Sequence, residues 1–360
     1  MPTRQQILRW LLTPLSWIYG AVTTTRNWMF DNHILKQQEY DVPIICVGNI
    51  TVGGTGKTPH VEYIIENLSL DYNIAVLSRG YKRKTKGFLM VNSNSTPENV
   101  GDEPLQIYQK YGTRVKVAVC ENRKKGIAEL MRQFPDIQLI VLDDAFQHRY
   151  VKPKVSVLLM DYNRPIYKDK LLPLGRLREN WRQVERADVV VVTKCREEMT
   201  PLDYRLVYHE LGIRPYQGLY FSVVNYGGLL PVFPDDKPYS VNLNNLYEND
   251  TVLLLTGIAN PRGFVRHFRK YSFRVVVAHY PDHHDFKRKD IKALAEKFEK
   301  MKGERKVIIT TEKDAVRLAY NPYFPAKLKP YVFYIPIGIR ISASLNDKDF
   351  ISELRHKIDK

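Results

Sequence analysis

The sequence predicts an α/β fold with a mostly parallel sheet flanked by helices, a second smaller α/β domain and an N-terminal interfacial helix. Two observations predict the sheets. A glycine-rich segment stands between a strand-like and a helix-like run, and short apolar runs then alternate with helical patterns to the end of the chain. The interfacial helix rests on a third observation, the amphipathic pattern of the first 35 residues.

The first of these elements is a helix within residues 1–35, where apolar residues recur at helical spacing from 7 to 22. Trp10, Trp17 and Trp28 occur with several arginines, a combination typical of helices that lie in a membrane interface. The apolar stretch is too short to span a bilayer, which needs about 20 residues. Packing of this helix on the protein's own core is the alternative.

The glycine-rich segment at 51–58 follows an apolar run at 42–47 and precedes a helical pattern at 61–68. Backbone N–H groups in such a loop, together with a helix N-terminus, bind phosphate. Lys57 is placed to reach the β- and γ-phosphates of a nucleoside triphosphate, and the Thr58 hydroxyl to ligate Mg²⁺. The strict phosphate-loop pattern has glycine where this chain has Thr51. The expected nucleotide-binding residues are Thr51, Val52, Gly53, Gly54, Thr55, Gly56, Lys57 and Thr58.

The next part of the chain alternates buried-type strands with helices, which predicts a parallel sheet. Strands are expected at 74–77, 115–119, 139–142, 155–160 and 189–192, with helices at 124–133 and 201–211. Prolines and a glycine pair then mark 214–240 as an irregular or hairpin-like linker. We therefore expect a nucleotide-binding core domain at 36–213 and a smaller C-terminal domain at 241–360.

In the smaller domain the same alternation resumes. Strands are expected at 252–255, 274–278, 307–310 and 331–335, and helices at 261–270, 289–301 and 347–356.

Two carboxylate pairs are candidates for chemistry. Asp143 and Asp144 end an apolar strand, as metal-binding carboxylates do in phosphate-loop enzymes, although a turn Asp is the simpler alternative. Asp102 and Glu103 form an adjacent pair in which one could accept a hydroxyl proton while the other supports a metal. The alternative is that Asp102 only caps a helix around 105–111 and has no catalytic role.

Other charged segments stay ambiguous. The run at 280–286 holds two His and two Asp, consistent with a metal site, an oriented proton-transfer His or a surface turn. Basic loops at 78–84 and 172–179, which include Arg79 and Arg178, are suited to phosphate but equally to a solvated surface. The three cysteines are widely spaced without a C-x-x-C pair, which argues against zinc and for reduced thiols.

The net charge of +16 favours an anionic partner: nucleic acid, anionic lipid or a phosphorylated substrate. We find no nucleic-acid-binding motif, and the basic residues are scattered, so a nucleic-acid binder is the weaker interpretation. A phosphate-loop ATPase or GTPase acting on a soluble substrate is the other alternative. The guanine-reading Asn-Lys-x-Asp is absent, because Thr193 and Lys194 are followed by Cys195 and Arg196.

Several motifs together resemble the tetraacyldisaccharide 4′-kinase family of lipid A biosynthesis over nearly the whole chain. They are VGNITVGGTGKTP (47–59), LSRGY (77–81), VGDEPL (100–105), LDDAFQH (142–148), LLPLGRLRE (171–179), VVVTK (190–194), LTGIANPRGF (255–264), YPDHHDF (280–286) and TTEKDA (310–315). The resemblance implies transfer of the ATP γ-phosphate to the 4′-hydroxyl of tetraacyldisaccharide 1-phosphate, giving lipid IVA. Thr51 is a departure that this family tolerates.

The resemblance also implies roles for individual residues. Asp102 and His283 would be the catalytic pair that activates the hydroxyl, with Lys57 on the transferred phosphate. Thr58, Glu103, Asp143 and Asp144 would surround Mg²⁺; no role follows for His284. Arg79 and Arg178 are candidates for binding the lipid phosphate, and a cleft between the two domains would be the active site.

The partners follow from the same resemblance. We expect ATP and Mg²⁺, a lipid A precursor as substrate, and peripheral attachment to the cytoplasmic face of the bacterial inner membrane. Neither a nucleic acid nor an obligate protein partner is expected.

Overall fold

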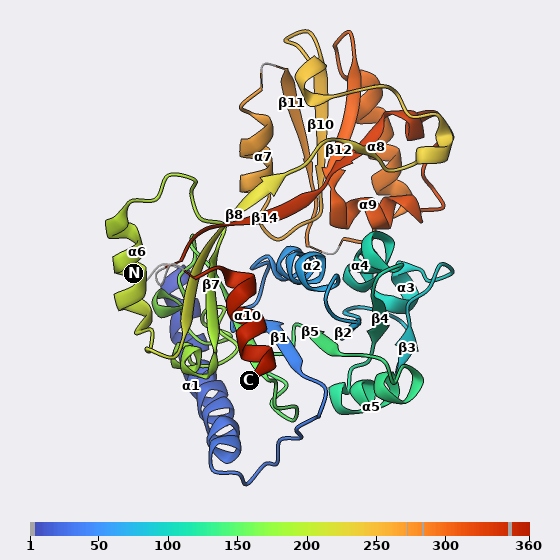
Figure 1. Cartoon of the computed structure of the whole chain (residues 1–360). Coiled ribbons are helices and arrows are strands. Elements are labelled where there is room, and N and C mark those ends of the chain that lie inside the picture. The colour runs from blue at the N-terminus through green and yellow to red at the C-terminus, as the bar shows by residue number, and fades with distance from the viewer. Residues whose placement is uncertain (1–3, 272, 283, 345–347) are drawn as a thin grey trace.

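A nine-stranded sheet organises most of the chain (Figure 1). The computed structural model describes residues 4–271, 273–282, 284–344 and 348–360. The strands between the two edge strands all pair in parallel, as the buried apolar sequences of most of them predict. The order is β14 (Ile337–Ser344), β8 (Gly218–Tyr226), β7 (Val189–Thr193), β6 (Val155–Asp161), β1 (Ile44–Gly48), β5 (Leu139–Asp143), β2 (Ile74–Ser78), β4 (Lys116–Val119) and β3 (Leu89–Met90).

Helices cover both faces of this sheet, and a separate apolar core lies on each face. Residues next to the helix ends determine where a helix starts and stops. In α6, for example, Thr200 caps the N-terminus through a capping box, and Gly212 ends the helix in the left-handed conformation. The helices here are α2 (Lys57–Leu68), α3 (Pro97–Val100), α4 (Asp102–Tyr111), α5 (Arg123–Gln133), α6 (Pro201–Leu211) and α10 (Phe350–Asp359).

A second, five-stranded sheet has its own core (Figure 1). Its order is β11 (Arg274–His279), β10 (Thr251–Thr256), β12 (Lys306–Thr311), β13 (Val332–Ile335) and β9 (Leu230–Pro231). Its helices are α7 (Arg262–Phe268), α8 (Arg288–Lys300) and α9 (Glu312–Ala319). Short 3₁₀ helices occupy Ile166–Lys168, Trp181–Arg186, Pro234–Asp236, Leu243–Asn245 and Ala326–Tyr331.

The chain passes between the two sheets twice, along an antiparallel ribbon of β8 and β14 that pairs Ile337 with Tyr226 and Ser344 with Tyr220. The segment 214–240, expected to be an irregular linker, therefore contains a long strand. Residues 337–360, expected in the smaller domain, lie instead with the nine-stranded sheet, because α10 buries Phe350 and Leu354 in its core. The helix expected at 347–356 begins at Phe350, and Asp347 lies outside the described residues.

Helix α4 of the first sheet and helix α9 of the second pack together through apolar and ionic contacts. Val316 of α9 is buried in the core of the first sheet. Lys110 on α4 contacts Glu312 of α9 at 2.9 Å and Glu62 of α2 at 2.6 Å. Because Glu62 and Glu312 are buried, this shared cation fixes how the second sheet sits on the first.

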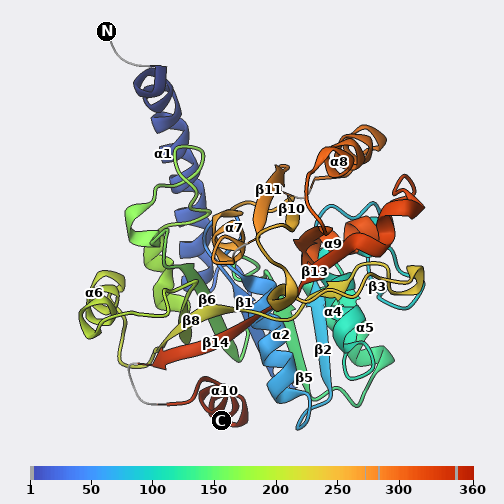
Figure 2. The same cartoon turned by 90° about the horizontal axis from the view of Figure 1, so that it is seen from above.

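Helix α1 (Arg4–Asp31) runs through Pro14 and projects from the body of the molecule (Figure 2). One face packs on the protein, where Phe30 is buried and the Tyr19 hydroxyl donates to the carbonyl of Arg178 at 2.7 Å. The other face exposes large apolar side chains: Trp10, Leu11, Leu15, Trp17, Ile18, Val22 and Trp28. Among the described helices, none is both long and apolar enough to cross a membrane.

Candidate active site

The glycine-rich loop joins the end of β1 to the start of α2, as predicted. Gly53 and Gly56 have φ angles of 107° and 88°, values that favour glycine. Gly56 precedes Lys57, the first residue of α2, so the loop leads directly into a helix N-terminus. The unpaired N–H groups of that first turn make the loop suited to phosphate.

Neighbouring elements hold the loop in shape. Asn49 donates its side-chain N–H to the Thr55 hydroxyl at 2.8 Å, and the Thr193 hydroxyl donates to the Thr55 carbonyl at 2.8 Å. Lys194 donates to the carbonyl of Gly54 and pairs with Asp161 at 2.8 Å. The loop is therefore fixed from the carboxyl ends of β6 and β7, the edge where ligands bind in open α/β sheets.

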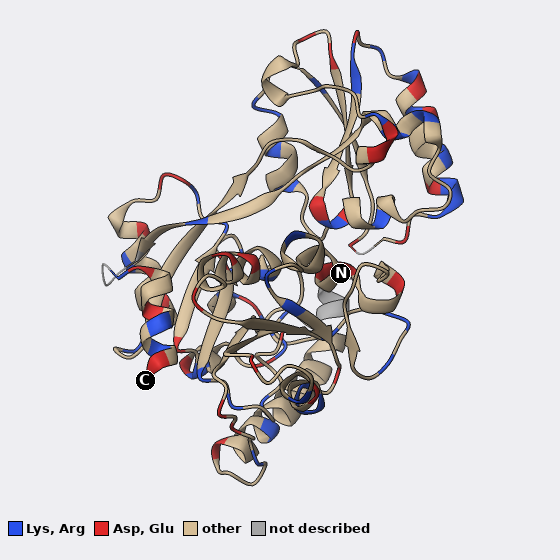
Figure 3. Cartoon of the chain, turned by 45° about the vertical axis from the view of Figure 1, so that its right-hand side comes forward, with Lys and Arg blue, Asp and Glu red and all other residues tan. Residues whose placement is uncertain are grey.

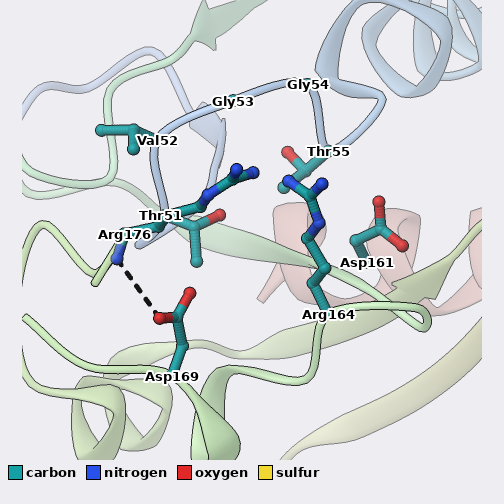
Figure 4. Close-up of a pocket in the computed structure, with 9 residues that line it drawn as sticks. All are labelled: Thr51, Val52, Gly53, Gly54, Thr55, Asp161, Arg164, Asp169 and Arg176. Carbon is teal, nitrogen blue, oxygen red and sulfur yellow. Dashed lines mark hydrogen bonds between the residues drawn. The ribbon is translucent and has the colours of Figure 1, made fainter. Parts of the chain in front are cut away.

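A small pocket lies beside the loop and is lined by Thr51–Thr55, Asp161, Arg164, Asp169 and Arg176. Figure 4 shows the guanidinium groups of Arg164 and Arg176 directed toward the glycine segment. The carbonyl of Arg176 accepts a hydrogen bond from the N–H of Val52 at 2.8 Å. These two arginines add positive potential to the loop. Arg176 belongs to the basic loop 172–179 that was expected to suit phosphate, whereas Arg164 was not predicted.

Lys57 and Arg178 meet on one carboxylate. Lys57 lies 3.6 Å and Arg178 3.1 Å from Oδ1 of Asp144. Burial alone would raise the pKa of Asp144, but these two cations outweigh burial and lower it. The sequence-predicted Lys57, Asp144 and Arg178 are therefore brought together.

Asp143, the neighbour of Asp144 in the sequence, is fully buried. Burial, then the charges of Glu103 and Asp144, raise the pKa of Asp143 to about 7. Its Oδ2 accepts from the Ser78 hydroxyl at 3.3 Å, whereas its Oδ1 has no hydrogen-bond partner among the described residues. An unpaired buried carboxylate oxygen facing two further carboxylates is an arrangement that a cation would stabilise.

The described residues contain no ready-made group of three or more His, Cys, Asp and Glu side chains for a metal. Oxygen ligands from one or two carboxylates, completed by phosphate oxygens, are nevertheless typical of Mg²⁺ sites. The Asp143 Oδ1 atom therefore fits an incompletely protein-bound Mg²⁺ better than a dedicated metal centre.

Asp102 and Glu103 begin α4, and cations of α9 hold both. The Arg317 Nε–H donates to Asp102 at 2.8 Å, and Lys313 donates to Glu103 at 2.9 Å. Arg317 also donates to the buried Asp314 at 2.9 Å. The second sheet thus supplies the partners of both candidate carboxylates, and all of these side chains are largely buried.

The other candidates fall in different places. His283 lies outside the described residues. His284 stacks on Tyr280 at 4.7 Å and contacts Asp290 at 2.9 Å, which is a local structural role. Arg79 is exposed just after β2, at the same edge of the sheet as the glycine loop.

His60 in the first turns of α2 is a further residue that sequence analysis missed. It is 1% exposed, and its ring nitrogens contact the Gly56 carbonyl at 2.7 Å and the Ser222 hydroxyl at 2.9 Å. Burial lowers the pKa of His60 to about 4, so the ring is neutral near pH 7. A buried His after Gly-Lys-Thr carried no local signal, because its partner Ser222 lies 162 positions away.

Other missed residues are Lys313 and Arg317. The TTEKDA segment holding Lys313 was recognised as a motif, but its contact with α4 is formed only in the folded chain.

Comparison with known proteins gives consistent results. The family model for tetraacyldisaccharide-1-P 4′-kinase, LpxK, matches residues 8–359. A tetraacyldisaccharide 4′-kinase of Bacteroides thetaiotaomicron is 46% identical over 349 residues, which cover 95% of this chain and 91% of that protein. One from Porphyromonas gingivalis is 42% identical and covers 97% of both chains.

Among solved structures, the "apo" form of LpxK from Aquifex aeolicus in complex with ATP superposes with a TM-score of 0.73. It is 27% identical, and the match covers 98% of both chains.

The lowered pKa of His60 predicts a pH dependence of stability. In the unfolded chain His60 binds a proton below about pH 6.5, whereas the folded ring does so only near pH 4. Stability is therefore lost as pH falls from 6.5 toward 4, by about 1.4 kcal/mol per pH unit. Urea unfolding at pH 7.5, 6, 5.5 and 5 should show a steeper loss for the wild type than for His60→Asn; parallel pH profiles would contradict this.

Proposed function

Since the chain belongs to the tetraacyldisaccharide-1-P 4′-kinase family, and so is an ATP-dependent kinase of that lipid, we propose that its reaction occurs where the glycine loop meets the α4–α9 contact. The γ-phosphate of ATP passes to the 4′-hydroxyl of tetraacyldisaccharide 1-phosphate. The observation that carries this location is the convergence of Lys57, Arg178 and Asp144 beside the carboxylates at the start of α4. A phosphate-loop protein with a soluble substrate is not favoured.

The nucleotide phosphates bind the N–H groups of residues 51–58, with Lys57 on the transferred phosphate. Lys57 reaches Asp144 at 3.6 Å, longer than a direct hydrogen bond, so a phosphate oxygen can compete for its ammonium group. Arg178 and Lys57 together supply two positive charges where negative charge develops. Phosphoryl transfer depends mainly on such positioning and charge neutralisation.

The residues fit a Mg²⁺ ion held by Asp143 and Thr58, with Asp144 and Glu103 nearby, because Asp143 Oδ1 is buried and no described residue bonds to it. When bound, this ion would neutralise charge on the phosphates. The neighbouring Ser78 and Arg123 keep Asp143 in place, through Ser78 on its carboxylate and Arg123 on its carbonyl at 2.9 Å.

Asp102 is the group that we propose accepts the proton of the 4′-hydroxyl, paired with His283. Arg317 holds the Asp102 carboxylate and is itself fixed by Asp314, which also accepts the N–H of Gly257 at 2.8 Å. The hydrogen bonds from Gly257 to Asp314 and from Arg317 to both Asp314 and Asp102 therefore support one orientation of the Asp102 carboxylate. We propose that the active site lies between the large sheet, to which β8, β14 and α10 belong, and the second sheet.

Arg79 and Arg178 are the two arginines expected to bind the lipid 1-phosphate, and we propose that only Arg79 does so. Arg79 is exposed and available to an incoming anion, whereas Arg178 already contacts Asp144 and Gln147. Arg178 is therefore better placed for the ATP side, and Arg79 for the lipid side.

The outer face of α1 is proposed to dock on the cytoplasmic face of the inner membrane. Trp10, Trp17 and Ile18 are 83%, 72% and 62% exposed, an apolar grouping typical of interfacial helices. In the view of Figure 3, Lys and Arg are spread over both parts of the molecule among Asp and Glu. Attachment is therefore attributed to the apolar face of α1 rather than to one basic surface.

The kinase reaction is tested by transfer of labelled γ-phosphate from ATP to tetraacyldisaccharide 1-phosphate in mixed micelles. Wild-type protein should produce labelled lipid. Lys57→Ala should reduce the rate at least about 100-fold, because it removes a charge that stabilises the transferred phosphate. If the wild type binds ATP but labels no lipid, a different acceptor is indicated.

The role of Asp102 is tested with Asp102→Asn, which keeps the shape of the side chain but cannot accept a proton. We expect kcat to fall about 10²–10⁴-fold while ATP affinity, measured by calorimetry, stays within about threefold. Asp203→Asn, a change at the capping box of α6, serves as the control. A kcat for Asp102→Asn equal to that of the control would remove Asp102 from proton transfer.

Membrane docking is tested by sedimentation with phosphatidylcholine–phosphatidylglycerol vesicles. The double variant Trp17→Glu, Ile18→Glu should bind at least about tenfold more weakly, because each buried apolar side chain contributes about 1.5–3 kcal/mol. Leu70→Glu changes an exposed apolar side chain just after the end of α2 and should bind like the wild type. Equal binding by all three proteins would contradict docking through α1.

A further inference from the structure

His60 connects the glycine loop to a strand that leads to the second sheet. One ring nitrogen, Nδ1, contacts the carbonyl of Gly56 at 2.7 Å, and the other, Nε2, contacts the hydroxyl of Ser222 at 2.9 Å. Ser222 is fully buried on β8, where its carbonyl accepts the N–H of Cys195 at 3.0 Å. Both nitrogens of a buried ring are therefore used.

The partners determine the orientation of the hydrogen bonds. A carbonyl oxygen can only accept, so Nδ1 carries the proton and donates to Gly56. In the neutral ring Nε2 then accepts from the Ser222 hydroxyl. Ser222 thereby fixes both the tautomer and the rotation of the ring.

The carbonyl that His60 holds is at a sensitive position of the loop. Gly56 has a φ of 88°, and a Cβ added to it would lie 3.6 Å from Nδ1 of His60, so the ring sits directly against this residue. The Gly56 carbonyl and the Lys57 N–H belong to one planar trans peptide and point in opposite directions. The Gly56 carbonyl accepts both the Nδ1–H of His60 at 2.7 Å and the backbone N–H of His60 at 3.3 Å. Holding the carbonyl in this direction turns the N–H of Lys57 toward the concave side of the loop, where a phosphate binds.

From these contacts we infer that His60 is a positioning residue for ATP, acting through its hydrogen bond to Gly56, with Ser222 orienting its ring. This inference rests on the proposed nucleotide site and deepens it. The residue touches no phosphate itself. It keeps the loop preorganised, so that binding does not have to reorder the Gly56–Lys57 peptide.

The inference also links the loop to the rest of the molecule. Ser222 pairs with Ile341 in the β8–β14 ribbon, and this ribbon continues to the second sheet. The imidazole of His60 thus connects the Gly56–Lys57 peptide to the β8–β14 ribbon, which joins the two sheets.

Two amide variants separate this role from simple packing. In His60→Asn the side-chain NH₂ takes the place of Nδ1 and keeps the bond to Gly56. In His60→Gln the amide reaches the place of Nε2 and the side-chain bond to Gly56 is lost, whereas the backbone N–H of residue 60 still donates to that carbonyl. Both variants are polar and of similar size, so loss of packing alone predicts similar effects.

The measurement is ATP affinity with Mg²⁺ by calorimetry, on the full chain, without lipid. We expect His60→Asn to bind within about threefold of the wild type and His60→Gln about tenfold more weakly, as loss of one hydrogen bond implies. Ser222→Ala, which frees the ring to rotate, should weaken binding about threefold. Ser156→Ala, which removes a buried hydroxyl on β6 that is bonded to Asp188 at 2.8 Å, is the control and should leave ATP affinity unchanged.

Equal affinities for His60→Asn and His60→Gln would overturn the inference, as would a loss in Ser156→Ala as large as that in His60→Gln. A wild type that binds no ATP would instead contradict the proposed nucleotide site. Thermal unfolding of each variant establishes that the compared proteins are folded.

Discussion

The two sheets of this molecule are held together largely by cations that pair with buried or partly buried carboxylates. Four carboxylates meet where the strands of the large sheet end and α4 begins, and leaving any of them buried and unpaired would cost several kcal/mol. Their cations come from three separate parts of the chain: Lys57 and Arg178 for Asp144, Lys313 for Glu103, and Arg317 for Asp102. The remaining one, Asp143, has an oxygen without a hydrogen-bond partner among the described residues, and this is the oxygen to which we assign the proposed Mg²⁺.

The position of the second sheet follows from this constraint. Helix α9 supplies two of the four cations, and it can do so only while it lies against α4. Lys110, shared between Glu62 and Glu312, extends the same ionic contact to the helix that begins with Lys57. A displacement of the second sheet would therefore change the charges around Asp102 and Glu103 together, which is how an active site between two parts can respond to substrate.

The sequence was sufficient to predict the parallel strands, because runs such as 139–142 and 189–192 are wholly apolar and fully buried. The glycine loop, Lys57 and the Asp143–Asp144 pair were also predicted, because their pattern depends on residues that are close in the sequence. Strands β8 and β14 were missed. Their pairing joins residues more than 100 positions apart, and the prolines and glycines around β8 gave a stronger local turn signal.

The parts of the site that escaped prediction all depend on tertiary contacts. Arg317 and Asp102 are 215 positions apart, and His60 and Ser222 are 162 apart. The sequence spacing of Lys313 and Arg317 indicates only that they share one face of a helix. Their contact with α4 forms only when the two sheets come together, so no local sequence pattern predicts it.

One segment joins the candidate membrane face to the phosphate loop. The carbonyl of Leu171 accepts the Ser16 hydroxyl, and the carbonyl of Arg178 accepts the Tyr19 hydroxyl, so the inner face of α1 holds both ends of residues 171–178. The same segment gives the Arg178 side chain to Asp144 and the Arg176 carbonyl to Val52. A helix whose outer face lies on a membrane would thus orient, through these hydrogen bonds, the residues that surround the transferred phosphate. In the proposed docking, this arrangement would bring the reacting group of an acyl-chain-bearing substrate to the loop while its acyl chains stay in the bilayer.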